Sequence, residues 1–319
     1  MQNKGIIGAV CGDIIGSAYE FHKTKDYWFK LFTSQSTFTD DTVMTCAVAE
    51  WLMDDPKHSH EKLIEIMHRY GEEYPHRGYG GMFKQWLENK WTEPYNSFGN
   101  GSAMRVSPVG YYAKSLDEAL QLAQISAEVT HNHPEGIIGA QAVAATIFLL
   151  RSGEWLEKGK KFLKDFCFYD LEEIKKDWND IYKFYTFDVT CQGSVPEAIY
   201  CGLPHLAWDK IADYIEKYCF YKINYKAKEW EEHVQNYSFD VTCQGSVPEA
   251  IVCSLGNIDY EQCIRAAISL GGDADTQAAI AGGIIAAYRP VPDYILNECL
   301  DRLDPPLVDV IDRFNEFVK

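Results

Sequence analysis

The sequence predicts a protein built from α-helices around one hydrophobic core, and three stretches support that prediction. Apolar residues recur at helical spacing in residues 260–270. Residues 115–127 have an amphipathic helical pattern, and residues 136–150 form an uncharged run of small and apolar residues that suits a buried helix. A chain of 319 residues with 46% hydrophobic content can bury a sizeable core, so we expect one globular domain over residues 1–319.

The charge and the cysteine content exclude several classes of protein. The formal net charge is −17 and no basic patch offsets it, which argues against binding to nucleic acid or to an anionic membrane surface. The ten cysteines include no CxxC pair, so we expect reduced thiols in a cytoplasmic protein. The first residues lack a signal-peptide pattern, and residues 136–150 are too short to span a bilayer. We expect a monomer that does not associate with membranes.

The first predicted helix covers residues 4–20 and is rich in small residues, so it can pack close to a neighbouring helix. Glu20 would lie at its end, where the negative end of the helix dipole disfavours an acid. Such a position is typical either of a carboxylate with a functional role or of one that points into solvent. The small residues are Gly5, Gly8, Ala9, Gly12, Gly16 and Ala18.

Two motifs rich in acids and threonine stand at predicted helix starts. Thr39-Asp40-Asp41-Thr42 precedes a helix over residues 43–53. Gly271-Gly272-Asp273-Ala274-Asp275-Thr276 separates the helix over residues 260–270 from another over residues 277–288, with the two glycines as the break. Taken alone, each motif is a helix cap, because Asp and Thr side chains satisfy the free N–H groups of a first turn.

Taken together, the two motifs indicate a metal site if they meet in space. Their carboxylates would then repel one another unless cations lay between them. The oxygen ligands come without nearby Cys or His, which suits Mg²⁺ or Mn²⁺ better than Zn²⁺. The carboxylates concerned are Asp40, Asp41, Asp273 and Asp275.

Residues 77–102 contain two glycine-rich loops. Arg77-Gly78-Tyr79-Gly80-Gly81 precedes a short helix around Trp86. Asn96-Ser97-Phe98-Gly99-Asn100-Gly101-Ser102 precedes Ala103-Met104-Arg105, so its backbone N–H groups could cradle a phosphate and Phe98 could stack on a base. Such a loop is often only a turn, so this pattern is weak evidence by itself.

The histidines of the chain give little sign of metal binding. His131 and His133 form a His-x-His pair in a turn before a proline, and such a turn is more often structural. The acid motifs already supply a harder ligand set, so we keep His131 only as a candidate contact for a ligand. We expect four other histidines to be solvated, namely His58, His60, His68 and His76.

The second half of the chain contains a tandem duplication. Residues 187–199 recur without change at residues 239–251, an offset of 52 residues. The two copies extend over about 162–203 and 214–255, and two copies without a third cannot build a repeat array. The second copy runs directly toward the Gly271 motif, which makes it the better partner of the predicted site.

Several motifs in fixed order resemble those of a known family. They are Gly12-Asp13-x-x-Gly16 with Glu20, Thr39-Asp40-Asp41-Thr42, Gly99-Asn100-Gly101 with Ala103-Met104-Arg105, Thr130-His131, Ser246-Val247-Pro248-Glu249-Ala250 and Gly271-Gly272-Asp273-Ala274-Asp275-Thr276. Together they resemble the ADP-ribosylglycohydrolase family, which includes the dinitrogenase reductase-activating glycohydrolases and the ADP-ribosyl-acceptor hydrolases. The duplicated segment departs from the family pattern, which has one Ser-Val-Pro-Glu-Ala unit.

The resemblance implies an all-α, compact orthogonal multi-helix bundle with a binuclear metal cleft. It implies two Mg²⁺ (or Mn²⁺) ions held by Thr39, Asp40, Asp41, Asp273, Asp275 and Thr276. Catalytic roles would fall to Glu20, Asp40 and Asp275, with Glu20 near the scissile bond. The glycine loop would hold the diphosphate, Phe98 would lie by the adenine and His131 would line the ribose side. The implied substrate contacts are Asn96, Ser97, Phe98, Gly99, Asn100, Gly101, Ser102 and His131.

The implied activity is hydrolysis of the glycosidic bond between ADP-ribose and an acceptor, which is a protein side chain or a small molecule. Breaking an anomeric bond develops positive charge, which carboxylates around the sugar stabilise. Two cations would hold the ribose hydroxyls and a water and lower the pKa of that water. Glu20 or a metal-bound Asp would then accept the proton.

Two other functions stay open at this point. A two-metal phosphohydrolase would use the same carboxylates, but it would need a cationic group, for which Arg105 is the only candidate in the glycine loop. A non-catalytic ADP-ribose-binding protein or a structural descendant, of the kind that crystallins related to the family represent, is the second alternative. A structural descendant would have no need of all the acid motifs.

Overall fold

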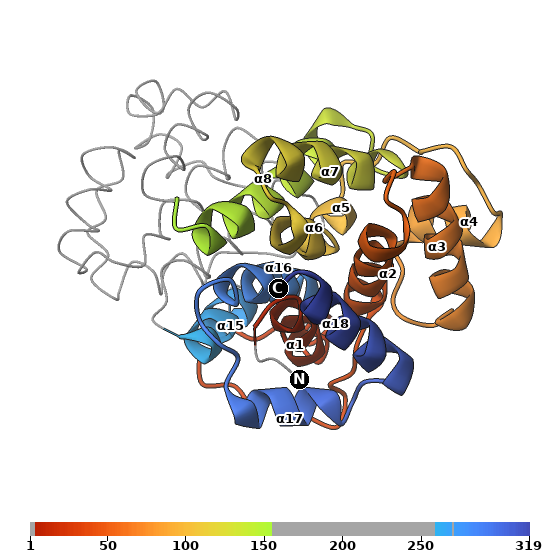
Figure 1. Cartoon of the computed structure of the whole chain (residues 1–319). Helices are drawn as coiled ribbons and strands as arrows, with labels where there is room; N and C mark the ends of the chain where they lie inside the picture. Colours follow the sequence, from red (N-terminus) through yellow and green to blue (C-terminus); the bar gives the residue numbers. More distant parts are fainter. Residues whose placement is uncertain (1–3, 155–258, 270) are drawn as a thin grey trace, which may run out of the picture.

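The computed structural model describes residues 4–154, 259–269 and 271–319. Within these ranges every regular element is a helix, which confirms the predicted all-α fold (Figure 1). No helix in the described ranges is long and apolar enough to cross a bilayer. Both copies of the duplicated segment, about 162–203 and 214–255, lie outside the described residues, so a single domain over residues 1–319 that contains this segment stays a prediction.

Two helices pack backbone to backbone at the centre of the fold. α1 (Ile7–Gly16) and α16 (Ala274–Ile285) lie side by side, and every residue of both is buried (Figure 1). A side-chain carbon at Gly12 would lie 2.0 Å from the carbonyl oxygen of Ala278, so glycine is required there. Similar contacts are made by Gly8, against Gly282, and by Gly16, against Ala274.

The first helix is shorter than the sequence predicts. It ends at Gly16, and residues 17–20 form a turn. The Ser17 hydroxyl bonds back to the helix backbone, and the backbone N–H of Tyr19 donates to the carbonyl of Gly16 at 2.7 Å. These local bonds replace the next helical turn. Glu20 therefore lies beyond the helix, and the argument that placed it at the helix end is wrong.

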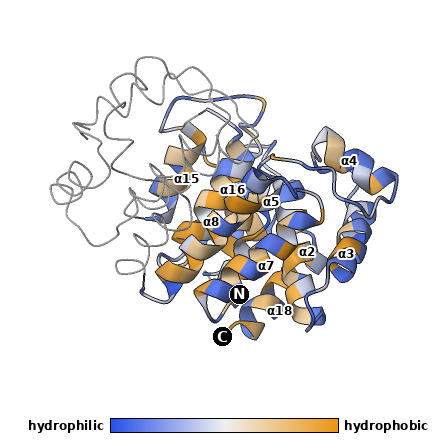
Figure 2. Cartoon of the chain, turned by 90° about the horizontal axis from the view of Figure 1, so that it is seen from above, coloured by the Kyte–Doolittle hydropathy of each residue, from blue (hydrophilic) through white to orange (hydrophobic). Residues whose placement is uncertain are grey.

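The other helices surround this pair, and those predicted from the sequence are present with small shifts at their ends. Hydrophobic residues make up most of the buried α8, whereas α3 carries hydrophilic residues on its outer face (Figure 2). The helices are α2 (Asp40–Asp54), α3 (His60–Glu73), α4 (Gly81–Glu88), α5 (Gly101–Met104), α6 (Ser107–Tyr112), α7 (Leu116–Glu128), α8 (Pro134–Arg151), α15 (Tyr260–Ser269), α17 (Asp293–Leu300) and α18 (Pro305–Phe317).

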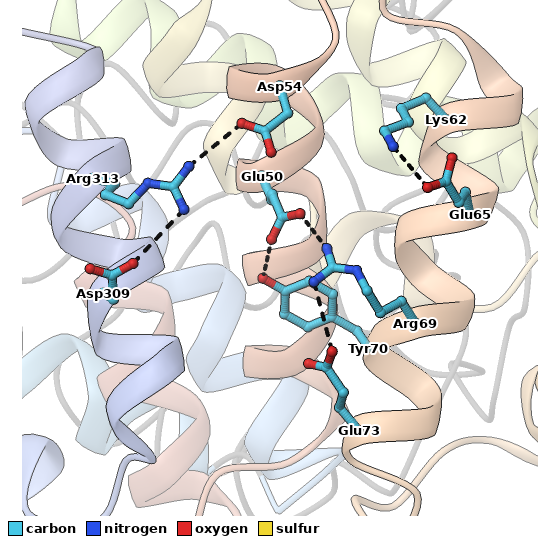
Figure 3. Close-up of polar contacts among 9 residues, drawn as sticks. All are labelled: Glu50, Asp54, Lys62, Glu65, Arg69, Tyr70, Glu73, Asp309 and Arg313. Carbon is cyan, nitrogen blue, oxygen red and sulfur yellow. Dashed lines mark hydrogen bonds and ion pairs between the residues drawn. The ribbon is translucent and has the colours of Figure 1, made fainter.

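Charged and polar side chains join the outer helices to α2 (Figure 3). Glu50 of α2 accepts hydrogen bonds from Arg69 and Tyr70 of α3, the second at 2.8 Å. Arg313 of α18 lies 3.5 Å from Asp54 of α2. Exposed ion pairs contribute little stability, so we assign these pairs to fixing the orientation of the helices.

Two of the histidines that the sequence predicted to be solvated are packed instead. His68 stacks on Trp86, with ring centroids 4.2 Å apart. His58 lies between the rings of Trp51 and Tyr112, each at 5.4 Å. Other helices supply the aromatic rings, so the polar sequence around these histidines could not reveal the contacts.

Replacing Gly12 with alanine tests the contact between α1 and α16. The added methyl group would collide with the Ala278 carbonyl, so Gly12→Ala should lower the free energy of unfolding by about 3 kcal/mol. Gly81→Ala is the matched control, because a methyl group there meets no atom within 4 Å. The control should shift the unfolding free energy by less than about 0.5 kcal/mol. Urea unfolding measures both, and equal midpoints would contradict the close approach.

Candidate functional site

Asp13 of α1 fixes the start of α2. Its buried carboxylate accepts hydrogen bonds from the backbone N–H groups of Thr39, at 2.9 Å, and Thr42, at 3.1 Å. The hydroxyls of the same two residues also donate to it, at 2.7 Å and 2.5 Å. The carboxylate thus satisfies N–H groups that a helix start leaves unpaired. Asp13 belongs to the Gly12-Asp13-x-x-Gly16 motif but is not among the predicted site residues, because one acid inside an apolar helix gives no local sign of what it faces.

Three helices contribute one carboxylate each to a first group of acids. Asp13 of α1, Asp41 of α2 and Asp275 of α16 offer oxygens that lie within 4.8 Å of one another. The Thr276 hydroxyl donates to Asp41 Oδ2 at 3.2 Å. The two acid motifs, which are distant in the sequence, are therefore in direct contact.

A second group of acids consists of Glu20, Asp273 and Asp275, whose oxygens also lie within 4.8 Å of one another. Asp275 belongs to both groups, so the two form one continuous acidic site. The side-chain amide of Asn100 donates to Asp273 Oδ2 at 2.7 Å and brings the start of α5 to the same place. Glu20 is half-buried, whereas Asp273 and Asp275 are buried.

Asp40 lies beside the two groups and faces the glycine turn of residues 78–81. A side-chain carbon at Gly78 would lie 3.5 Å from Asp40 Oδ1, and Gly78 has a φ of +90° that favours glycine. Side-chain carbons at Gly80 and Gly81 would meet no atom within 4 Å, so the backbone at the start of α4 is open. This turn was predicted only as a loop, although it precedes a helix as residues 96–102 do.

The crowding and burial of the acids raise the pKa values of their carboxyl groups. Burial raises the pKa of Asp273 to about 7, and burial with the charge of Asp275 raises the pKa of Glu20 to about 8. Burial is also the main cause that raises the pKa values of Asp13, Asp41 and Asp275. The site therefore holds protons near neutral pH unless cations replace them.

The donor set of the site fits a hard divalent cation. Asp41 Oδ1 and Asp275 Oδ1 are buried and have no hydrogen-bond partner among the described residues. A buried carboxylate oxygen without a donor is costly, and coordination to a cation would satisfy it. Both groups consist of carboxylates, without Cys or His, which suits Mg²⁺ or Mn²⁺ better than Zn²⁺.

The glycine loop of residues 96–102 turns its last polar side chains inward. Asn100 contacts Asp273, as described above, and the Ser102 hydroxyl donates to the carbonyl of Gly136 at 2.7 Å. These contacts anchor the loop to the acidic site on one side and to α8 on the other. Both residues were predicted to belong to a phosphate-binding loop, and their contacts inside the protein are not evident from the sequence.

The front of the same loop is at the surface. Phe98 is 46% exposed, and its ring centroid lies 5.7 Å from that of His133. The backbone N–H of Gly99 donates to Ser97 Oγ at 3.1 Å, and Asn96 has a left-handed φ of 55°. An aromatic face is therefore available to a ligand near the acidic site.

His131 lies behind this loop and is buried, with 5% exposure. Its Nδ1 is 2.7 Å from the hydroxyl of Thr130. Its Nε2 would lie 3.0 Å from a side-chain carbon at Gly101, the first residue of α5. The ring edge thus faces the residue that follows Asn100.

Comparison with known proteins finds similarity over nearly the whole chain. A family model described as ADP-ribosylglycohydrolase matches residues 4–317. The ADP-ribosylhydrolase ARH3 of Homo sapiens is 28% identical, with 89% of this chain and 84% of the human protein covered. An uncharacterized protein of Archaeoglobus fulgidus is 26% identical, with 93% and 90% covered. A solved structure of an ADP-ribosylglycohydrolase-related protein complex has a TM-score of 0.56 at 16% identity, covers 99% of this chain and 93% of that chain, and supports the fold.

The raised pKa values predict that the metal-free protein loses stability as the pH rises. A carboxyl group whose folded pKa exceeds its unfolded value of about 4 stabilises the fold at low pH, and this contribution is lost as the pH rises through the folded pKa. For Asp273 and Glu20 the loss extends to about 7 and about 8. With a chelator, the melting temperature should therefore fall from about pH 5 to about pH 8.

The same protein in excess Mg²⁺ is the control for this measurement. A cation binds the deprotonated carboxylates, so Mg²⁺ should raise the melting temperature more at the high end of the pH range than at the low end. The difference between the two series removes the contribution of carboxyl groups outside the site. A difference that does not change with pH would contradict the proposed link between the acids and a cation.

Proposed function

Because the chain belongs to the ADP-ribosylglycohydrolase family, we propose that it releases ADP-ribose from a modified protein side chain or a small molecule. The name of the human relative, an ADP-ribosylhydrolase, supports this reaction. The observation that carries the proposal is the contact between the two acid motifs, with Asp275 shared by both groups of carboxylates. A glycohydrolase needs such carboxylates around a sugar, because the bond that breaks leaves positive charge on it.

We propose that two divalent cations, Mg²⁺ or Mn²⁺, bind at this site. Asp275 would serve both ions because it belongs to both groups, and Asp41 and Asp275 each have an oxygen without a donor. Asp13 accepts four hydrogen bonds from Thr39 and Thr42, so we assign it to holding the α2 motif in place. Bound cations would neutralise the carboxylates, hold sugar hydroxyls and lower the pKa of a water. The proposed ligands are Thr39, Asp40, Asp41, Asp273, Asp275 and Thr276.

Glu20 is the residue that we assign to proton transfer. It lies on the turn after α1, it is partly exposed, and its carboxylate belongs to the same group as Asp273 and Asp275. A carboxylate at this place can accept a proton from a water held at the site. Asp40 and Asp275 are the other proposed catalytic residues, since their carboxylates lie at the acidic site where we propose that the sugar binds.

We propose that two helix starts hold the diphosphate of ADP-ribose. The glycine turn of residues 78–81 leaves open backbone at the start of α4, beside Asp40. The loop of residues 96–102 leads into α5, and its exposed Phe98 could stack on the adenine. Backbone N–H groups at such positions bind an anion without a basic patch, which agrees with the net charge of −17.

The two alternative functions have less support. A phosphohydrolase would need a cation at the phosphate, but Arg105 is 1% exposed and its Nη2 donates to Ser126 and Thr130. A purely structural protein would gain nothing from buried acids that repel one another. These observations favour the hydrolase.

The remaining expectations from the sequence stay proposals. We propose a monomer in the cytoplasm that forms one domain over residues 1–319. The cysteines of the described residues support a reducing compartment, because all are buried and Cys11, Cys46 and Cys299 are free thiols.

The reaction is tested by release of free ADP-ribose from arginine-linked and serine-linked ADP-ribosyl peptides. Release should occur with Mg²⁺ or Mn²⁺ and stop with a chelator, since the carboxylates need cations to bind the sugar. The peptide that reacts identifies the linkage. If neither peptide releases ADP-ribose, and ADP-ribose with metal does not raise the melting temperature, the proposal is wrong.

Two substitutions separate metal binding from proton transfer. Asp273→Asn should abolish both metal binding and turnover, because it removes a charge from the second group of acids. Glu20→Gln should keep metal binding but lower kcat by roughly 10²-fold or more, the usual contribution of a general base. Isothermal titration with Mn²⁺ and single-turnover kinetics measure the two effects.

The matched controls are Asp309→Asn and Glu65→Gln, which make the same chemical changes at exposed positions. Both controls should bind metal and turn over as the unmodified protein does. A Glu20→Gln variant with unchanged kcat would remove Glu20 from the mechanism and leave the metal site as proposed.

A further inference from the structure

A buried polar chain runs behind the glycine loop, from Arg105 through Thr130 to His131. The Arg105 guanidinium is 1% exposed, and its Nη2 donates to the carbonyl of Ser126 at 2.7 Å and to the hydroxyl of Thr130 at 2.9 Å. The same hydroxyl lies 2.7 Å from Nδ1 of His131. All three side chains are buried, so each hydrogen bond limits which donors and acceptors the next side chain can offer.

The direction of these bonds fixes where the His131 ring carries its hydrogen. A guanidinium only donates, so Arg105 occupies one lone pair of the Thr130 oxygen. The Thr130 hydroxyl has a single hydrogen, and in a buried place that hydrogen needs an acceptor. Nδ1 of His131 can accept it only when Nδ1 has no hydrogen of its own. The ring is then neutral and carries its hydrogen on Nε2.

The surroundings of the ring agree with this neutral form. Burial lowers the pKa of His131 well below its ordinary value, and the positive charge of Arg105 lowers it further. A second proton on the ring would also leave two donors, Nδ1–H and the Thr130 hydroxyl, facing each other.

The free edge of the ring faces the start of α5. A side-chain carbon at Gly101 would lie 3.0 Å from Nε2 and 3.1 Å from Cε1, so the absence of a side chain at this position leaves room beside the ring. The preceding residue, Asn100, donates to Asp273 in the acidic site. Nε2 therefore lies next to the loop of residues 96–102, which contacts the acidic site through Asn100.

We propose that Arg105 and Thr130 are positioning residues that hold His131 in the tautomer with hydrogen on Nε2, so that Nε2–H donates to an oxygen of the ligand beside Gly101. This proposal rests on the proposed function for the identity of the ligand, since ADP-ribose offers hydroxyl and phosphate oxygens as acceptors. It also gives Arg105 a role that does not require contact with substrate. The guanidinium acts through Thr130 and determines which ring nitrogen donates.

The tautomer is measured directly by NMR of the full chain with ¹⁵N-labelled histidine, with His131→Gln used to assign the signals. The unmodified protein should show Nδ1 without hydrogen and Nε2 with hydrogen. Thr130→Val removes the hydroxyl and should give a mixture of tautomers, whereas Thr130→Ser should keep the single form. Thr146→Val is the matched control, because its buried hydroxyl donates to Ala142 within α8 and takes no part in the chain.

Arg105→Gln tests the first member of the chain. The shorter side chain cannot reach Thr130, and the Ser126 carbonyl also loses its donor. That carbonyl can then accept the Thr130 hydroxyl hydrogen, the hydroxyl oxygen can accept from Nδ1–H, and the second tautomer should appear. Circular dichroism and the melting temperature show whether this variant folds. If it does not fold, the comparison of Thr130→Val with Thr130→Ser still decides whether Thr130 holds the His131 tautomer.

Binding of ADP-ribose in Mg²⁺ tests whether Nε2–H reaches the ligand. Thr130→Val should weaken binding by the inverse of the fraction of protein that keeps hydrogen on Nε2, about twofold for an equal mixture, and Thr130→Ser should restore it. Gly101→Ala would place a methyl carbon 3.0 Å from Nε2 and keeps the hydrogen-bonding groups of Arg105, Thr130 and His131, so it should weaken binding while the ring keeps one tautomer. If Thr130 had only a structural role, Thr130→Val would not change the tautomer and binding together while Gly101→Ala changes binding alone.

Several outcomes would overturn the proposal. Hydrogen on Nδ1, or a doubly protonated ring, in the unmodified protein would mean that Nδ1 donates to Thr130 and does not accept from it. An unchanged tautomer in Thr130→Val would remove the positioning role. If the unmodified protein binds no ADP-ribose, the ligand half fails together with the proposed function, and the NMR result separately decides the role of Arg105 and Thr130.

Discussion

The close approach of α1 and α16 is the constraint on which the candidate site depends. Glycine at positions 8, 12 and 16 lets the two backbones touch, and a side-chain carbon at Gly12 would lie 2.0 Å from the carbonyl of Ala278. Asp13 follows that contact on α1, and Asp275 lies at the start of α16. A wider separation of the helices would move these two carboxylates apart. The packing of small residues therefore sets the spacing of the acids, and through it their charge.

The acids at this junction oppose folding when no cation is bound. Their pKa values are raised because burial and mutual repulsion disfavour the charged forms. Hydrogen bonds from Thr39, Thr42, Thr276 and Asn100 satisfy some of the oxygens, but Asp41 Oδ1 and Asp275 Oδ1 keep no donor. Such an arrangement gives up stability in the metal-free state in favour of a site that can bind cations, which is the usual compromise of a functional site.

The start of α5 connects the acidic site with the rest of the proposed cleft. Asn100 donates to Asp273, and the next residue, Gly101, leaves room beside His131. His131 is in turn held by Thr130, which receives a hydrogen bond from Arg105. A short helix and its loop thus bring together the Asp273 carboxylate, the His131 ring and the Arg105 guanidinium.

The sequence by itself determined the helices, the two acid motifs and the duplication, because helical periodicity, capping residues and repeats are local patterns. It also predicted that carboxylates from both motifs would meet. Only the tertiary structure decided that Asp13 supports the α2 motif, that Asp40 faces the turn at Gly78, and that Arg105 is buried behind His131. These contacts depend on how closely whole helices approach one another. That distance is set by packing between residues far apart in the chain, which no local pattern records.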